Sequence, residues 1–115
     1  MRDFRELDVW RKAHQLALDV YRTTDSLPKS EVFGITVQLR RAAVAIPTRI
    51  AEGCGRDGGL EFAACVNKAR ATASELEYLL LLCRDLGYLT AEAHEQLGGN
   101  AITVRKMMFG LVKRL

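Results

Sequence analysis

The sequence is poor in the residues that mark most catalytic, metal-binding and secreted proteins. It contains two prolines, two histidines and three cysteines among 115 residues, and 7% of its residues are aromatic. Its longest apolar run, YLLLLC at 78–83, is far shorter than the roughly 20 residues of a membrane-spanning helix. The N-terminal sequence MRDFRELD also lacks the apolar region of a signal peptide. We therefore expect a cytoplasmic protein with no membrane partner.

The cysteines are too few and too widely spaced to form a recognisable framework. Cys54, Cys65 and Cys83 are separated by 11 and 18 residues, so the chain has no CxxC metal motif. Their odd number argues against a disulfide scaffold of the kind found in small secreted domains. We expect three reduced thiols, with Cys65 and Cys83 in helices and Cys54 exposed within the GCG sequence at 53–55.

The histidines and the glycine cluster match no common catalytic motif. A di-iron helical bundle carries a glutamate three residues before each metal-binding histidine. Here Arg11 precedes His14 and Ala91 precedes His94 at that spacing. The cluster GCGRDGG at 53–59 lacks the Gly-Lys-Ser/Thr ending of a nucleotide-binding loop. We therefore expect no enzymatic activity, no metal and no cofactor, and we expect both histidines at the surface or at its boundary.

A strong helical periodicity is present throughout the chain. With 49% hydrophobic and 27% charged residues, residues 1–115 have the composition and length of one folded domain. Apolar residues recur at spacings of three and four in four segments, as one buried helix face requires. These segments are Asp8–Asp25, Val32–Ile50, Phe62–Cys83 and Ala93–Leu115. Short connections between them predict an all-α, up-down-up-down antiparallel four-helix bundle.

Capping residues and glycines indicate where these helices begin and end. Asp8, Ser30 and Thr90 are candidate N-caps, because their side-chain oxygens can accept from free backbone N–H groups of a first turn. Leu86-Gly87 is a candidate C-cap of the third helix, and the glycine cluster at 53–59 ends the second. Gly98 and Gly99 lie inside the fourth helix, where each weakens the helix by about 1 kcal/mol relative to alanine.

Pro47 interrupts a segment whose apolar phase continues on both sides of it. A proline inside a helix removes one hydrogen bond and costs about 3 kcal/mol, so we expect a helix that continues through Pro47 with a bend. Two explanations remain open. The bend either fits the helix around the core, or presents a polar face made of Gln38, Arg41, Ala45, Thr48 and Glu52. An ion pair between Arg41 and Glu75 on the neighbouring helix is a structural alternative to a binding role for Arg41.

Positive charge is concentrated in two segments, although the net charge is only +3. Residues 38–56 carry four arginines against one glutamate, and residues 101–115 carry four cations against no acid. Such segments form either a footprint for a polyanion or ordinary solvated helix faces. The candidate nucleic-acid-binding residues are Arg40, Arg41, Arg49, Arg56, Arg105, Lys106, Lys113 and Arg114.

Four blocks of the sequence resemble a known protein family. They are FRELDVWRKAHQLALDVY, LPKSEVFGITVQLRRAAVAIPTRIAEGCGR, SELEYLLLLCRDLGYL and MMFGLVKRL. Together they are similar to the four-helix-bundle proteins encoded within intervening sequences of bacterial 23S ribosomal RNA genes. The most specific block surrounds Pro47. It departs from the family pattern at two positions: Ala45 stands where the family usually has serine, and Arg49 where it usually has asparagine. Any polar function of that serine and asparagine is therefore not expected of this chain.

The resemblance implies a four-helix bundle that assembles as a homopentamer. It extends to accessory proteins of diversity-generating retroelements, which associate with nucleic acid and a reverse transcriptase. Two functions follow as hypotheses. The first is a non-catalytic oligomer that contacts RNA or DNA phosphates through the eight cations, multiplied around a ring. The second is a scaffold whose function is assembly, with apolar residues outside the core stripes as its seam: Phe4, Leu7, Leu60, Met107 and Phe109.

Overall fold

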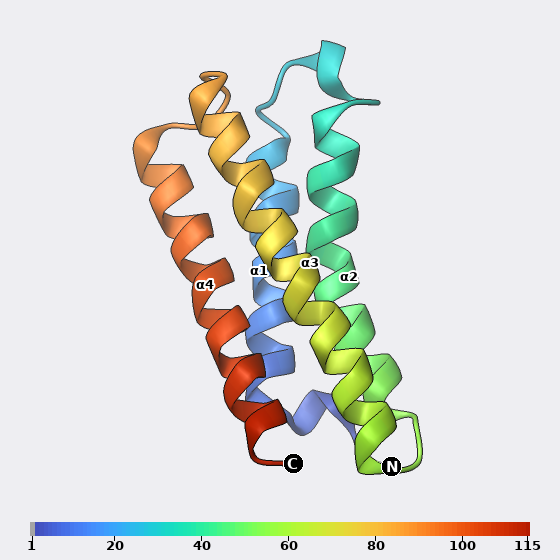
Figure 1. The fold of residues 1–115 in the computed structure, drawn as a ribbon. Coiled ribbons are helices and arrows are strands. Elements are labelled where there is room, and N and C mark those ends of the chain that lie inside the picture. Colours follow the sequence, from blue (N-terminus) through green and yellow to red (C-terminus); the bar gives the residue numbers. More distant parts are fainter. Residues whose placement is uncertain (1) are drawn as a thin grey trace.

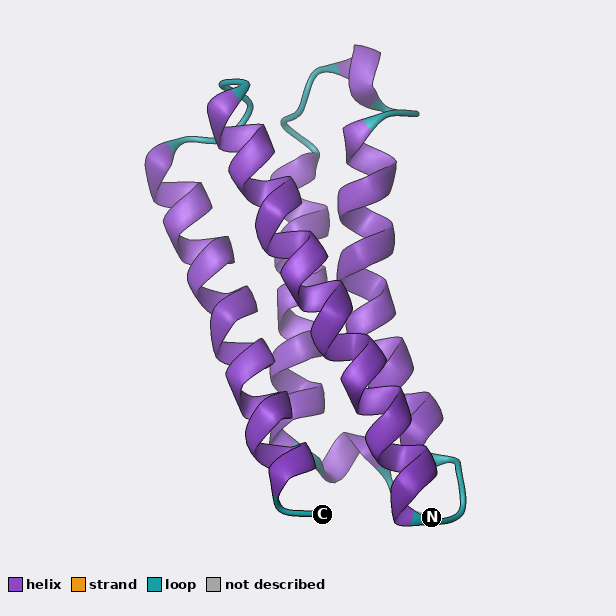
Figure 2. Cartoon of the chain, viewed as in Figure 1, coloured by secondary structure: helices purple, strands orange, loops and turns teal. Residues whose placement is uncertain are grey.

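The computed structural model describes residues 2–115, and they form four α-helices joined by short loops (Figures 1 and 2). Two short 3-10 helices, η1 and η2, precede α1 and α2. The elements are η1 (Phe4–Glu6), α1 (Asp8–Thr24), η2 (Lys29–Glu31), α2 (Ile35–Cys54), α3 (Gly59–Asp85) and α4 (Ala91–Lys113). No strand occurs in this range. The predicted all-α, up-down-up-down bundle is confirmed.

The helices pack as an elongated bundle of about 44 × 23 × 20 Å. α2 packs on α3 and α1, and α4 packs on α3 and α1, so α2 and α4 occupy opposite corners (Figure 1). The start of α1, the end of α4 and the α2–α3 loop share one end of the bundle. This arrangement decides which charged residues can meet, because the two basic segments lie on α2 and α4.

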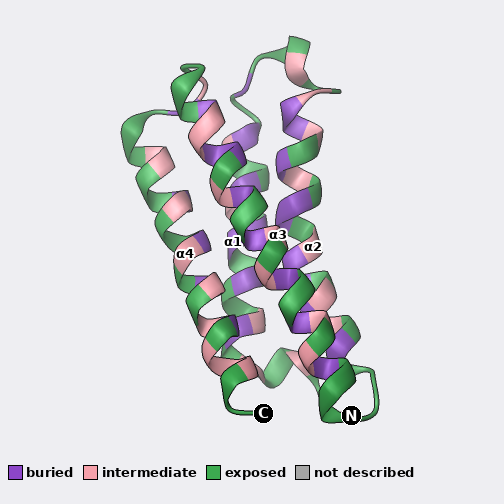
Figure 3. Ribbon diagram, in the orientation of Figure 1, coloured by how far each residue is buried: buried purple, intermediate pink, exposed green. Residues whose placement is uncertain are grey.

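The core is one continuous cluster built from the predicted stripes (Figure 3). Leucine, isoleucine and valine dominate it, and alanines on every helix allow the backbones to approach closely. Burying one such large side chain contributes about 1.5–3 kcal/mol. The largest fully buried side chains are Leu16, Val20, Leu39, Ile46, Ile50, Val66, Leu76, Leu80, Val104 and Met108.

The helix ends confirm some predicted caps and correct others. The Thr90 hydroxyl accepts from the Ala93 N–H at 3.0 Å, and Gly87 has a positive φ of 80° after α3, both as predicted. Asp8 is not the N-cap of α1: Leu7 holds that position, because η1 ends immediately before it. Asp8 instead lies in the first turn, where its carboxylate pairs with Arg11 and still complements the helix dipole.

The start of the second helix is later than its apolar phase predicts. Ser30 does not cap it, because residues 29–31 form η2 and Gly34 is the N-cap of α2. Val32 is therefore not part of the buried stripe and is exposed, as is Leu115 beyond the end of α4. The Glu31 carboxylate accepts from the Ile35 N–H at 3.4 Å, so a side chain from η2 satisfies one of the free backbone N–H groups in the first turn of α2.

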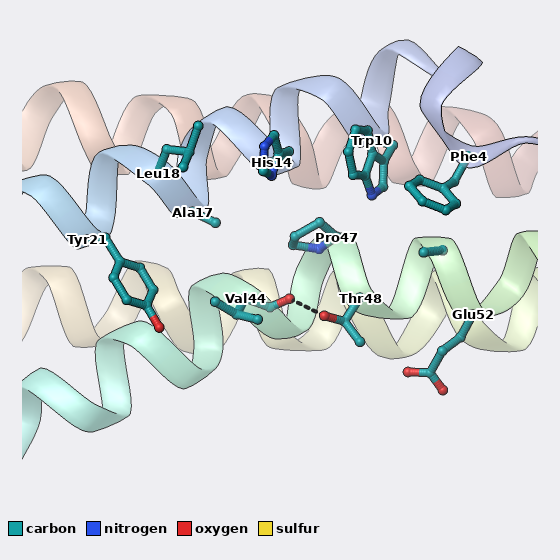
Figure 4. Close-up of a pocket in the computed structure, with 11 residues that line it drawn as sticks. Phe4, Trp10, His14, Ala17, Leu18, Tyr21, Val44, Pro47, Thr48 and Glu52 are labelled. Carbon is teal, nitrogen blue, oxygen red and sulfur yellow. Dashed lines mark hydrogen bonds between the residues drawn. The ribbon is translucent and has the colours of Figure 1, made fainter.

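α2 continues through Pro47, as predicted, and the proline is buried. Its ring lies between α1 and α2, so it contributes apolar surface to the contact between these helices (Figure 4). The next residue, Thr48, donates its hydroxyl to the Val44 carbonyl one turn earlier at 2.7 Å, a back-bond that often accompanies helix bending. Packing against α1 is thus a structural reason for the proline, while the bend itself remains a prediction.

The expectation that Cys54 is exposed is wrong. α2 extends as far as Cys54, and its thiol is buried at the end of the core beside the N-terminal segment. Burial raises the pKa of Cys54, and it raises the pKa of Cys83 to about 11. Cys65 and Cys83 lie in α3 as predicted, and all three cysteines are free thiols.

Candidate nucleic-acid interface

The midpoints of the four helices divide the bundle into two halves of opposite charge. The basic half contains both chain ends and the α2–α3 loop, and it holds 12 of the 17 lysines and arginines but six of the 14 acids. The acidic half contains the α1–α2 and α3–α4 connections, with five cations and eight acids. The net charge of +3 is therefore the sum of a formal charge of +6 on the basic half and −3 on the acidic half.

The cations of the basic half come from all four helices and the segments beside them. They are Arg2, Arg5, Arg11, Lys12, Arg49, Arg56, Lys68, Arg70, Arg105, Lys106, Lys113 and Arg114. Convergence of α1, α4 and the α2–α3 loop at one end brings these residues together. A concentration of one sign of charge raises the local potential and attracts a polyanion to that end.

Arg40, a predicted binding residue, is held by its own chain. Its guanidinium donates to the Thr24 hydroxyl at 2.9 Å, to the Tyr21 carbonyl at 3.3 Å and to Asp25 at 3.0 Å. It also lies over the Tyr21 ring, 4.6 Å from the centroid. These contacts satisfy a carbonyl in the last turn of α1 and join α1 to α2. Arg40 therefore has a structural function at this helix end.

Arg105 and Arg49 are also paired with acids of the same chain. Arg105 donates to Glu77 at 2.6 Å, which links α4 to α3, and this hydrogen bond together with the nearby charge raises the pKa of Arg105. Arg49 lies 3.6 Å from Glu52 on the same helix, with both side chains partly exposed. The positive charge of both arginines is thus partly neutralised before any ligand arrives.

The other five predicted residues have no acidic partner within residues 2–115. All five are exposed: Arg41, Arg56, Lys106, Lys113 and Arg114. The alternative pairing of Arg41 with Glu75 is wrong, because no ion pair joins them. Four of the five lie in the basic half, and Arg41 lies in the acidic half.

The two basic segments do not form one face. α2 and α4 occupy opposite corners of the bundle, so cations along their length point to different sides. They approach each other only at the end of the bundle, where Arg56 follows α2 and Lys113 and Arg114 end α4. Lys106 and Arg114 also line a groove of about 660 Å³ between α1 and α4, with Glu6 and Asp8 on its other wall. The candidate interface is therefore the end of the bundle and this adjoining groove.

An apolar groove between α1 and α2 is the feature that sequence reasoning missed. It has a volume of about 710 Å³, and its walls carry Phe4, Trp10, Leu18, Val44 and Pro47 (Figure 4). The Trp10 ring stacks on His14, with ring centroids 5.0 Å apart. The sequence did contain a signal: the apolar residues Leu18 and Val44 lie outside the predicted core stripes. A second groove of about 480 Å³ adjoins it along α2 and contains Arg40, Arg41 and Arg49.

A third apolar groove lies on the opposite side of the bundle, between α3 and α4. Its volume is about 720 Å³, and Tyr78, Leu81 and Ile102 are its apolar walls. Gly98, which is partly exposed, and Gly99, which is exposed, form part of it. Of the predicted seam residues, Leu60 and Phe109 are exposed, whereas Phe4, Leu7 and Met107 pack against the core.

The predicted positions of the histidines are confirmed, with His14 exposed and His94 partly exposed. Within residues 2–115, no three histidine, cysteine, aspartate or glutamate side chains are placed to hold one metal ion. None of the described helices is long and apolar enough to cross a membrane.

Comparison with known proteins agrees with this architecture. The bundle is similar to the 1.70 Å crystal structure of a protein of unknown function from the S23 ribosomal protein family of Bacteroides thetaiotaomicron VPI-5482. The TM-score is 0.83 at 23% sequence identity, and the match covers 91% of this chain and 98% of the other. No curated protein matches the chain. Residues 5–110 match the family described as 23S rRNA-intervening sequence protein, and the chain therefore belongs to that family.

Proposed function

We propose that this protein is a non-catalytic, oligomeric nucleic-acid-associated protein that contacts RNA or DNA phosphates through its basic half. The charge separation along the bundle supports this proposal most strongly. Of the candidate residues, four are exposed, unpaired with acids and located in that half: Arg56, Lys106, Lys113 and Arg114. Phosphate contacts by such side chains release condensed counterions, and this release supplies most of the affinity of sequence-independent binding.

Recognition of phosphates rather than bases fits the aromatic residues of the basic half. Phe62 is buried, and the Phe4 and Trp10 rings pack against each other in a tilted arrangement, with centroids 4.8 Å apart. Phe109 is half-exposed, but the Arg70 guanidinium lies 4.8 Å from its ring centroid. Few aromatic faces are thus free to stack on bases, so we expect binding that tolerates sequence and weakens steeply with salt.

Assembly would multiply this modest charge. The resemblance to the family implies a homopentamer, in which five basic ends repeat around one axis and present a continuous belt of cations. A reverse transcriptase is a partner only if the chain is encoded in a retroelement. The second candidate function is a scaffold without physiological nucleic-acid binding. The two large apolar grooves on opposite sides of the bundle favour this alternative.

Fluorescence anisotropy with a labelled RNA duplex separates these functions. The basic-half variant carries Arg56→Gln, Lys106→Gln, Lys113→Gln and Arg114→Gln. Its control carries Arg22→Gln and Lys29→Gln, two exposed cations of the acidic half. At about 50 mM salt we expect the basic-half variant to bind at least about 100-fold more weakly than the wild type, because four phosphate contacts are lost. Equal losses in both variants, or no binding by the wild type, would leave the scaffold function.

A further inference from the structure

The grooves on opposite sides of the bundle are complementary in charge. The α1/α2 groove and its extension along α2 contain three arginines and one acid, Glu52. The α3/α4 groove contains two acids, Glu77 and Glu95, and one arginine. After the pairs formed within the chain are set aside, Arg41 remains on the first surface and Glu95 on the second. One groove therefore carries an unpaired positive charge and the other an unpaired negative charge.

These two charges also lie at the same level along the bundle. α2 and α4 both begin at the acidic end, and Arg41 and Glu95 both lie in the second turn of their helices. A second copy placed beside the first, with its axis parallel, would therefore bring Glu95 of one chain level with Arg41 of the other. The apolar walls would meet in the same contact, Tyr21 and Val44 on one side and the α3/α4 groove on the other.

The glycines of α4 provide an independent observation. A Cβ atom added at Gly99 would meet no atom within 4 Å, and one at Gly98 would meet only the His94 ring, at 3.8 Å. The isolated chain therefore gives no steric reason for two helix-weakening residues in succession. Close approach of a second backbone is a reason, because glycine lets a neighbouring surface sit directly against the helix.

We infer that copies of this chain associate head to tail, with the α1/α2 surface of one protomer covered by the α3/α4 groove of the next. Arg41 and Glu95 form the intersubunit ion pair at this contact. Pairing of the α1/α2 surface with itself is disfavoured, because it would gather two sets of arginines in one interface. A head-to-tail contact repeats around an axis and closes into a ring when the rotation allows. The inference rests on the oligomeric part of the proposed function and assigns its surfaces.

Charge reversal with rescue tests this contact. The full-length chain, treated with nuclease, is studied by sedimentation velocity as wild type, Arg41→Glu, Glu95→Arg and the double variant. Each single reversal is expected to raise the dissociation constant at least about tenfold, and the double variant to restore association. Lys12→Glu, on the α1–α4 side of the bundle, is the matched control and leaves association unchanged. Circular dichroism melts confirm that each variant is folded.

A second probe uses the glycines. Gly99→Ala should raise the melting temperature of the isolated helix bundle, because alanine is the better helix residue, while it weakens association. A monomeric wild type, association that survives both single reversals, or a double variant no better than either single one would overturn the inference. Failure of the nucleic-acid function has a different signature: the reversals behave as expected, and the wild-type assembly does not bind the RNA duplex.

Discussion

Replacing Arg40 with methionine is expected to lower the free energy of unfolding by about 2 kcal/mol. Methionine retains much of the apolar stem and removes the guanidinium. The hydrogen bond to the buried Thr24 hydroxyl contributes about 1 kcal/mol, and the longer one to the Tyr21 carbonyl about 0.5 kcal/mol. The contact with the Tyr21 ring adds about 0.5 kcal/mol. The pair with Asp25 adds little, because that carboxylate is exposed.

Urea unfolding followed by circular dichroism measures this loss, which corresponds to a fall of roughly 8 °C in Tm for a domain of this size. Arg22→Met is the control. Arg22 is an exposed arginine on α1 whose contact with Asp19 spans 3.5 Å, and its loss should change stability by less than about 0.5 kcal/mol. If Arg40→Met is as stable as the control but binds RNA more weakly, the structural function assigned to Arg40 is wrong.

Three further predictions concern the core and the loops. Tyr88→Phe should lower the midpoint of urea unfolding, because the Tyr88 hydroxyl donates to Glu31 at 2.9 Å and joins the α3–α4 loop to η2. Gly53→Ala should destabilise the protein by about 1 kcal/mol in the same assay, because a Cβ there would lie 3.1 Å from the Phe62 ring, at the contact of α2 with α3. Since burial raises the pKa of Cys83 from 9.0 to about 11, the unfolded chain loses this proton at a lower pH than the folded chain. The free energy of unfolding should therefore fall as pH rises from 9 to 11, and the fall should be shallower in Cys83→Ala. An identical pH profile in the two proteins would contradict this role of Cys83.

The helices were predictable because the apolar spacing of a buried helix face can be read from neighbouring residues in the sequence, without knowing which helices pack together. The phase of Ile46 and Ile50 across Pro47 is visible in the sequence, and it required a helix that continues through the proline. The start of α2 was not predictable in this way. Val32 keeps the helical phase, yet η2 and Gly34 place it outside the helix, since local turn geometry prevailed over periodicity.

The site was less predictable because a cation in the sequence does not reveal its partner. Arg40 and Asp25 are 15 residues apart, and Arg105 and Glu77 are 28 apart, so their pairing depends on which helices pack together. The charge separation likewise depends on topology, which collects the ends of α1 and α4 and the α2–α3 loop at one end. Sequence segments alone suggested two basic stretches, whereas the fold distributes them to opposite corners.

The salt dependence of binding to an RNA duplex tests the central claim most directly, that the basic half neutralises phosphates. The observed binding constant is measured across a series of salt concentrations for the wild type and for the basic-half variant. Four contacts per chain predict a wild-type slope of log K against log salt of about −3.5 per bound chain, and a variant slope close to zero. The same slope in both proteins would contradict the account.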